Sequence, residues 1–152
     1  MKYYYHGSPI EIKKQLICKP SKIVDNEKVV FATNDIVFSV VFLTKWTNAD
    51  MEFSKFSNDQ PYVLREEYPG AFNIYKNASG YIYYVDSIFF EHDERLGMKE
   101  EFISHANVPI IKSKYIANVW KKLLNLQTNK KIILISFDTY AEIMKRYVKS
   151  LI

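Results

Sequence analysis

Short runs of apolar, aromatic and β-branched residues predict strands in several parts of the chain. The clearest are residues 3–6, 29–33, 81–85 and 101–105, of which 29–33 is a continuous apolar run and 101–105 alternates in the strand manner. β-Branched and aromatic residues in short runs of this kind are typical of half-buried or buried strands. Shorter runs of the same character predict further strands at 62–64, 72–75 and 108–111.

Helical spacing of apolar residues predicts three helices. The first covers 36–46 and follows Thr33-Asn34-Asp35, which offer helix caps, although its β-branched content leaves a strand as the alternative. The second covers 114–126, and the third covers 138–150 with Asp138 as its cap. The apolar run 132–135 fits either a strand or the lead-in to that last helix.

The remaining segments are irregular. Residues 10–15 fit a short helix or a turn, and 16–27 and 91–101 are interpreted as loops. Residues 47–79 are the least regular part of the chain, apart from the two short strands. A long irregular stretch inside a folded domain is often a functional loop.

Composition predicts one soluble globular domain spanning residues 1–152. A chain of 152 residues with 48% hydrophobic side chains can bury a core without a disulfide framework, and Cys18 is its only cysteine. The longest apolar run, 36–43, is too short to span a bilayer, and no secretory signal is visible. We expect a cytoplasmic protein with no membrane contact.

Charge is unevenly distributed along the chain. Residues 112–152 carry nine Lys or Arg and two Asp or Glu, a net charge of +7, and the first 111 residues carry −3. We therefore treat 112–152 as a basic helical C-terminal extension of the same domain. Its helices either contact nucleic acid or present solvated faces, and we favour solvated faces. In both cases we expect them to pack on the sheet with a basic outer face.

The opening strand carries the first candidate site. Tyr4 and His6 share one face of an extended strand, and Gly7-Ser8-Pro9 ends it. His6 would thus lie at the carboxyl end of the strand, beside a glycine that lets a ligand approach the backbone. On position alone, a surface or capping role for His6 is the alternative.

Several catalytic motifs are absent from the sequence. It has no Walker-type loop, no spaced glycine fingerprint and no Gly-x-Ser-x-Gly elbow. The histidines His6, His92 and His105 and the single cysteine lack zinc-site spacing, so no metal is expected. His105 is interpreted as a structural polar residue.

Three separated segments together resemble one family. Tyr5-His6-Gly7-Ser8 resembles the first motif of the ADP-ribosyltransferase fold, in its poly(ADP-ribose) polymerase-like branch. Residues 28–35 and the following helix resemble that branch's second strand and helix. Residues 101–108 resemble the strand that begins with its catalytic glutamate. The order and spacing agree over 3–108, whereas the part beyond residue 112 has no counterpart.

The resemblance implies an α+β fold with a split mixed or antiparallel sheet, flanking helices and a cleft that holds NAD. His6 would bind the adenosine ribose, the Gly7 backbone the nicotinamide amide, and Ser8 would support the site. Glu101 would stabilise the positive charge that develops on the nicotinamide ribose. These roles imply an ADP-ribosyltransferase that uses NAD as its substrate and modifies a protein or nucleic-acid acceptor.

The sequence departs from this family at the second strand. The family places a nicotinamide-stacking tyrosine there, whereas this chain has Val30 followed by Phe31. Phe31, Thr33 and Tyr83 are additional candidate cofactor-binding residues, and Tyr81, Tyr84 and the tyrosines within residues 62–75 are alternative rings. Loss of the tyrosine leaves a catalytically degenerate binding module as the alternative function. Strand alternation places Glu100 and Glu101 on opposite faces, and the resemblance selects Glu101.

Overall fold

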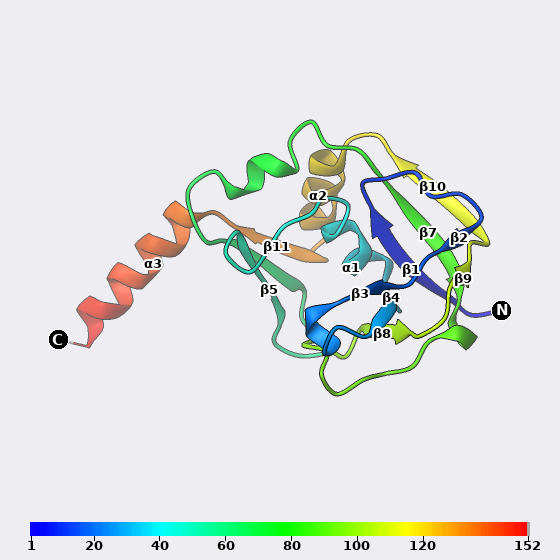
Figure 1. Cartoon of the computed structure of the whole chain (residues 1–152). Helices are drawn as coiled ribbons and strands as arrows, with labels where there is room; N and C mark the ends of the chain where they lie inside the picture. Colours follow the sequence, from blue (N-terminus) through cyan, green and yellow to red (C-terminus); the bar gives the residue numbers. More distant parts are fainter. Residues whose placement is uncertain (152) are drawn as a thin grey trace.

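The computed structural model describes residues 1–151, in which helices and strands form an α+β fold (Figure 1). The longer strands are β1 (Tyr3–Ser8), β4 (Lys28–Thr33), β5 (Met51–Lys55), β6 (Tyr62–Glu66), β7 (Gly80–Asp86), β8 (Glu101–Ser104), β10 (Lys112–Ile116) and β11 (Ile132–Ile135). The two-residue strands are β2 (Gln15–Leu16), β3 (Lys19–Pro20) and β9 (Val108–Pro109). The α-helices are α1 (Ile36–Val41), α2 (Val119–Thr128) and α3 (Phe137–Ser150). Short 3₁₀ helices cover Lys22–Val24, Ala71–Ile74 and Ser87–Phe89.

The larger sheet joins segments that lie far apart in the sequence. Its strand order is β10-β7-β1-β4-β3, and β8 also pairs with β4. All of these pairings are antiparallel. Thr33 of β4 pairs with both Tyr5 of β1 and Glu101 of β8, so β1 and β8 lie on opposite edges of β4.

A second sheet has the order β11-β6-β5, with β11 parallel and β5 antiparallel to β6. The main core lies where α1 and α2 meet the strands, and Val41, Leu64, Leu123 and Ile132 are fully buried in it. Aromatic side chains of α1, β5 and β6 pack together there, with Phe38 edge-on to Phe53 at 5.1 Å between ring centroids. Burial of this apolar surface is the main force holding the sheets to the helices.

Local signals explain where several predicted elements begin. The Asp35 carboxylate accepts a hydrogen bond from Val37 N at 3.0 Å and caps α1, as predicted. The helix ends at Val41 instead of residue 46, because the Phe42 amide turns back to the Ser39 carbonyl in a tight last turn. The apolar run 132–135, which was open between two interpretations, is strand β11.

Other predicted elements were wrong. Residues 72–74 belong to the 3₁₀ helix Ala71–Ile74 and not to a strand, and Tyr75 is its C-cap, because Gly70 enters the turn with a positive φ of 87°. Residues 10–15, which fitted either a short helix or a turn, form no helix, and Gln15 pairs with Pro109 in β2. Strand β5 was not predicted at all, because it lies in the irregular part of the sequence.

The C-terminal part is less helical than predicted. The helix expected from residue 114 begins at Val119, where the Asn118 side chain caps it by accepting from Lys121 N. The preceding residues form β10, an edge strand that pairs with β7. The spacing of apolar residues within this segment gives no sign of that pairing. Residues 112–151 thus contribute one strand to each of the two larger sheets, in addition to α2 and α3. Residue 152 lies outside the described range.

Helix α3 does not pack on the sheet, contrary to expectation. No α3 residue is buried, and Figure 1 shows it leaving the body of the molecule. Its cap is Ser136, whose hydroxyl accepts from Thr139 N, and not Asp138. The first turn is attached to β6 by the Phe137 amide, which donates to Glu66, and by Tyr140, whose ring lies 3.8 Å from the Arg65 guanidinium carbon. No helix of residues 1–151 has the length and apolarity needed to cross a membrane.

Candidate functional site

Glu101 lies at the end of a row of paired residues that crosses the larger sheet. Tyr5 pairs with Thr33, and Thr33 pairs with Glu101. Directly paired residues project from the same face of a sheet, so these three side chains share a face. In the next row of that face Phe31 pairs with Ile103. Phe31, and not the buried Val30, is therefore the second-strand candidate that shares a face with Glu101.

His6 projects from the other face. It pairs with Tyr83 of β7, and alternation along β1 separates it from Tyr5. β1 continues through Ser8, so His6 lies within the strand and not at its carboxyl end as predicted. The two predicted catalytic residues therefore come from strands on either side of β4 but from opposite faces of the sheet.

The backbone ladder between β1 and β4 is interrupted next to His6, and we call this interruption the gap. These strands share one paired position, Tyr5 with Thr33. His6 Nδ1 lies 2.6 Å from the Phe31 carbonyl oxygen, where the ladder would otherwise continue. The Lys2 carbonyl accepts a hydrogen bond from Ser87 N on the β7 side of β1. Successive residues of a strand direct their peptide groups alternately to the two neighbouring strands, so the peptide groups of Gly7 point toward β4. The N–H and C=O of Gly7 thus face this gap.

The protonation state of His6 follows from its contact. A carbonyl oxygen can only accept, so Nδ1 carries the hydrogen and donates it to Phe31. Burial lowers the pKa of His6, the Phe31 carbonyl partly opposes this, and the charge of Lys19 lowers it further. The imidazole is therefore neutral near pH 7, and its Nε2 is a hydrogen-bond acceptor.

Gly7 is required by helix packing, which the sequence did not reveal. A Cβ atom at this position would lie 2.2 Å from the Ser39 carbonyl oxygen and 3.4 Å from Leu43 Cδ2. The space above its α-carbon is thus filled by α1 and not left for a ligand, contrary to expectation. Its peptide groups at the edge of β1 are the part of Gly7 that faces the gap.

The carboxylate of Glu101 is partly buried beside a second acid. Burial, with a further contribution from the charge of Glu100, raises the pKa of Glu101 to about 7. Strand alternation does not extend to Glu100, because β8 begins at Glu101. Glu100 is itself buried, and its carbonyl accepts from Asn34 N at 3.2 Å. Glu100 is therefore buried directly before β8, and the expectation that it turns away from Glu101 stays a prediction.

Ionisation of Glu101 should make stability fall as pH rises. Between the ordinary pKa of 4.5 and the folded value of about 7, the folded chain keeps a proton that the unfolded chain releases. We expect the free energy of unfolding to lose on the order of 2 kcal/mol through this window from Glu101 alone. His6 has the opposite effect. Because the folded state lowers the pKa of His6, the unfolded chain binds a proton more readily, and the free energy of unfolding falls as pH drops below about 6.5.

Urea unfolding of the wild type and Glu101→Gln at several pH values between 5 and 8 separates the two effects. Glu101→Gln should gain stability relative to the wild type as pH rises. The exposed Glu94 is the matched control, and Glu94→Gln should follow the wild-type curve. Parallel curves for the wild type and Glu101→Gln would contradict the raised pKa.

Three further predicted residues have polar groups occupied within the protein. The Ser8 hydroxyl accepts from Ile10 N at 3.2 Å, and the buried Thr33 hydroxyl accepts from Asp35 N at 3.1 Å. The Tyr83 hydroxyl donates to the Ile10 carbonyl and accepts from Ile12 N. With 1% of its surface exposed, Tyr83 cannot offer a ring face to a ligand unless the loop at 10–12 moves.

An ionic network holds the loop that leads to Glu100 and Glu101. Arg95 bonds Asp93 within this loop, and Asp25 and Glu27 across from it. Hydrogen bonds from Arg95 and then His105 lower the pKa of Glu27 to about 2. His105, expected to be structural, joins Glu27 at 2.8 Å. The network connects the 3₁₀ turn at 22–24 to the acid pair.

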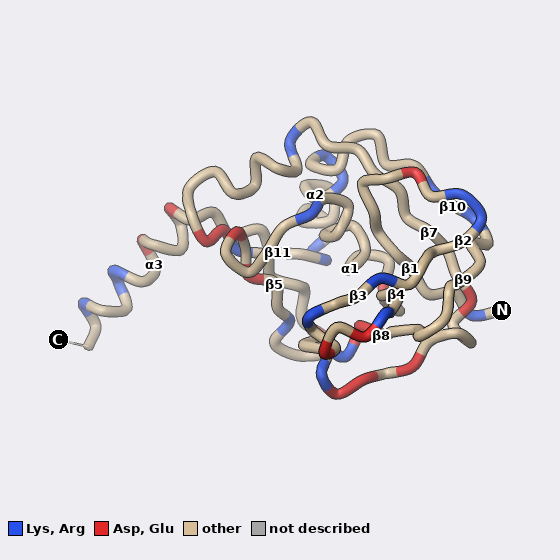
Figure 2. Tube along the Cα trace, in the orientation of Figure 1, with Lys and Arg blue, Asp and Glu red and all other residues tan. Residues whose placement is uncertain are grey.

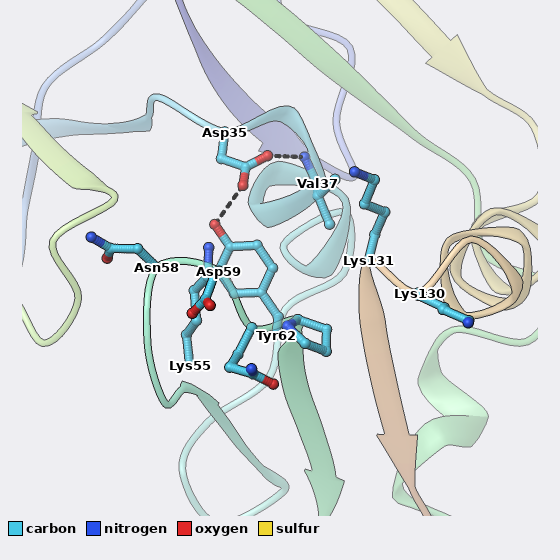
Figure 3. Close-up of a pocket in the computed structure, with 10 residues that line it drawn as sticks. Asp35, Val37, Lys55, Asn58, Asp59, Tyr62, Lys130 and Lys131 are labelled. Carbon is cyan, nitrogen blue, oxygen red and sulfur yellow. Dashed lines mark hydrogen bonds between the residues drawn. The ribbon is translucent and has the colours of Figure 1, made fainter.

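A polar pocket of about 230 Å³ lies at the start of α1 (Figure 3). The Tyr62 hydroxyl donates to the Asp35 carboxylate at 2.7 Å inside it. Burial and then the bond to Asp35 raise the pKa of Tyr62, and the charge of Glu100 adds to this. The pocket is also lined by three lysines, Lys55, Lys130 and Lys131. Lys55 belongs to β5 and the adjacent Lys130 and Lys131 precede β11, so no single sequence motif marks the pocket.

The pocket has a mixed charge. Its lining carries three lysines together with the carboxylates of Asp35 and Asp59, and the charge of Glu100 contributes to the raised pKa of Tyr62 inside it. Glu101 suits a group that develops positive charge. Residues 1–151 contain no cluster of three or more His, Cys, Asp or Glu side chains able to bind a metal ion.

A scan against protein-family models found no matching family, and searches of curated proteins and of solved structures found no similar protein.

Proposed function

We propose that this chain is an NAD-dependent ADP-ribosyltransferase that transfers ADP-ribose to a protein or nucleic-acid acceptor. The observation that carries the proposal is the gap between β1 and β4. The peptide groups of Gly7 face it, His6 reaches across it to Phe31, and Glu101 with Phe31 lies on the adjoining sheet face. The roles of these groups follow from the resemblance to the ADP-ribosyltransferase fold. Strand pairing places Phe31 and Glu101 on one face of the sheet and His6 on the other.

Each group has a defined role in this proposal. The Gly7 N–H and C=O bind the nicotinamide amide, and the Phe31 ring provides the aromatic surface beside it. The acceptor nitrogen of His6 receives a hydrogen bond from the adenosine ribose. Glu101, once ionised, stabilises the oxocarbenium-like ribose as the glycosidic bond breaks. Nicotinamide then leaves, and a nucleophile of the acceptor bonds to the anomeric carbon.

The second candidate is a binding module for an ADP-ribose-like or nucleic-acid ligand that lacks turnover. It is favoured by one specific observation, because His6 and Glu101 project from opposite faces of the sheet. A ligand that contacts both side chains has to pass through the gap. A module needs only one of the two faces.

The two candidates differ in what NAD does. Under the first, millimolar NAD raises the melting temperature and nicotinamide is released when a protein or RNA acceptor is added. Under the second, ADP-ribose or an oligonucleotide raises the melting temperature without nicotinamide release. If neither NAD nor ADP-ribose changes the melting temperature, the transferase proposal fails.

His6→Ala is expected to weaken NAD binding by roughly five- to tenfold, because one hydrogen bond to a ribose hydroxyl is lost. Isothermal titration of NAD measures this change. The exposed His92 provides the matched control, and His92→Ala should bind NAD like the wild type. Because His6 also bonds Phe31, the variant's melting temperature has to be compared before its affinity is interpreted. Unchanged affinity in a folded His6→Ala variant would remove His6 from the site.

A further inference from the structure

Helix α3 is attached to the body only through its first turn. Phe137, Tyr140 and Ala141 are partly covered there, and from Glu142 onward every described α3 residue is exposed. The apolar Ile143, Met144, Tyr147, Val148 and Leu151 are between 39% and 69% exposed. A helix that keeps this much apolar surface in water has a strong reason to bind a partner.

Four apolar residues of α3 and its C-cap Leu151 follow the spacing of a coiled-coil seam, whereas Tyr140, Ile143 and Tyr147 lie outside it. Phe137, Ala141, Met144, Val148 and Leu151 are separated by alternating steps of four and three residues. This is the heptad pattern in which one helix packs its seam against the seam of another helix. The seam predicts that the partner of α3 is itself a helix with a matching apolar stripe.

Charge along α3 is divided between its two halves. Asp138 and Glu142 lie in the first half, and Lys145, Arg146 and Lys149 lie in the second half. Figure 2 shows this change from acidic to basic along the projecting helix. At the base of α3, Glu52 of β5 and Glu67, which directly follows β6, both pair with the single guanidinium of Arg65, so acidic groups exceed basic ones there.

We infer that α3 docks antiparallel against α3 of a second copy of this chain. Asp138 and Lys145 each follow a seam residue by one position, so they lie on the same flank of the seam. Antiparallel docking places Asp138 of one copy near the partner's Lys145, and the same contact recurs by two-fold symmetry. It also brings each basic half to the acidic base of the other copy, and the two helix dipoles oppose each other. Parallel docking would place the two basic halves side by side.

The contact is small, so the association is concentration-dependent. α3 has 14 residues and is about 21 Å long, which places the interface in the size class of weak, transient contacts. Sedimentation velocity of the full chain from low to several hundred micromolar concentration should follow a monomer–dimer equilibrium. Added salt should weaken the dimer, because its orienting contacts are exposed ion pairs.

Charge exchange tests both the partner and its orientation. Lys145→Glu with Lys149→Glu, and separately Asp138→Lys with Glu142→Lys, should each weaken self-association by roughly tenfold or more. A one-to-one mixture of these two variants should recover the dimer. A chain that carries all four substitutions should self-associate like the wild type, because antiparallel docking again joins opposite charges.

Controls separate docking from loss of fold. Lys114→Glu with Lys121→Glu makes the same charge change at exposed positions away from α3 and should leave the dimer intact. Met144→Asp with Val148→Asp should abolish the dimer without changing the melting temperature of the monomer, because neither residue is buried.

Two results would overturn the inference. One is a wild-type chain that remains monomeric throughout the concentration range. The other is a dimer that the four-substitution chain fails to form. A monomer that binds a labelled RNA or DNA oligonucleotide through Lys145 and Lys149, with steep salt dependence, would instead assign the basic half to nucleic acid.

Discussion

Replacing Glu101 with glutamine is expected to slow nicotinamide release from NAD by roughly two to three orders of magnitude. Glutamine keeps the size and part of the hydrogen bonding of glutamate but not the negative charge that opposes the developing oxocarbenium. The loss should therefore appear in kcat, while NAD affinity changes little. Steady-state kinetics and NAD titration of the wild type and Glu101→Gln measure the two quantities.

The pH profile gives an independent check on Glu101. Its pKa of about 7 predicts that kcat rises as pH increases through neutrality, because only the ionised carboxylate stabilises the transition state. Glu100→Gln removes a neighbouring negative charge, so it should shift this midpoint to lower pH without abolishing turnover. If Glu100→Gln is the inactive variant, the wrong acid has been assigned to the ribose. If Glu101→Gln keeps full activity, Glu101 has no role in catalysis.

Gly7→Ala is expected to lower the free energy of unfolding by about 1–3 kcal/mol. The added methyl group would meet the Ser39 carbonyl at 2.2 Å, so α1 has to move away from β1. For a domain of this size each kcal/mol corresponds to about 2–4 °C in melting temperature. Thermal and urea unfolding of the variant and the wild type measure the loss.

Gly97 supplies the matched control for this substitution. A Cβ atom at Gly97 would have nothing within 4 Å, so Gly97→Ala should change the free energy of unfolding by less than about 0.5 kcal/mol. The Gly7 variant also tests the ligand role of its backbone. A Gly7→Ala protein with unchanged stability and lost NAD binding would show that the gap, and not the packing of α1, requires glycine.

Much of the local structure could be predicted from single segments. The runs at 29–33, 81–85 and 101–105 form strands β4, β7 and β8, and Asp35 caps α1 as its position indicated. These features depend on backbone propensity and on side-chain period, which neighbouring residues in the sequence determine. The prediction of a helix from residue 114 was wrong because it used only the local pattern. Residues 112–116 form a strand through their pairing with β7, which that pattern does not contain.

The arrangement of the candidate site was decided by tertiary structure. The sequence presents His6, Phe31 and Glu101 as separate candidates, but only the pairing of Thr33 with Tyr5 and Glu101 assigns each to a sheet face. A shift of one residue in either pairing would reverse those faces. The packing of α1 on Gly7, the burial of Tyr83 and the lysines around Tyr62 likewise join segments distant in sequence. Such contacts depend on how the whole core packs, and a local pattern cannot determine them.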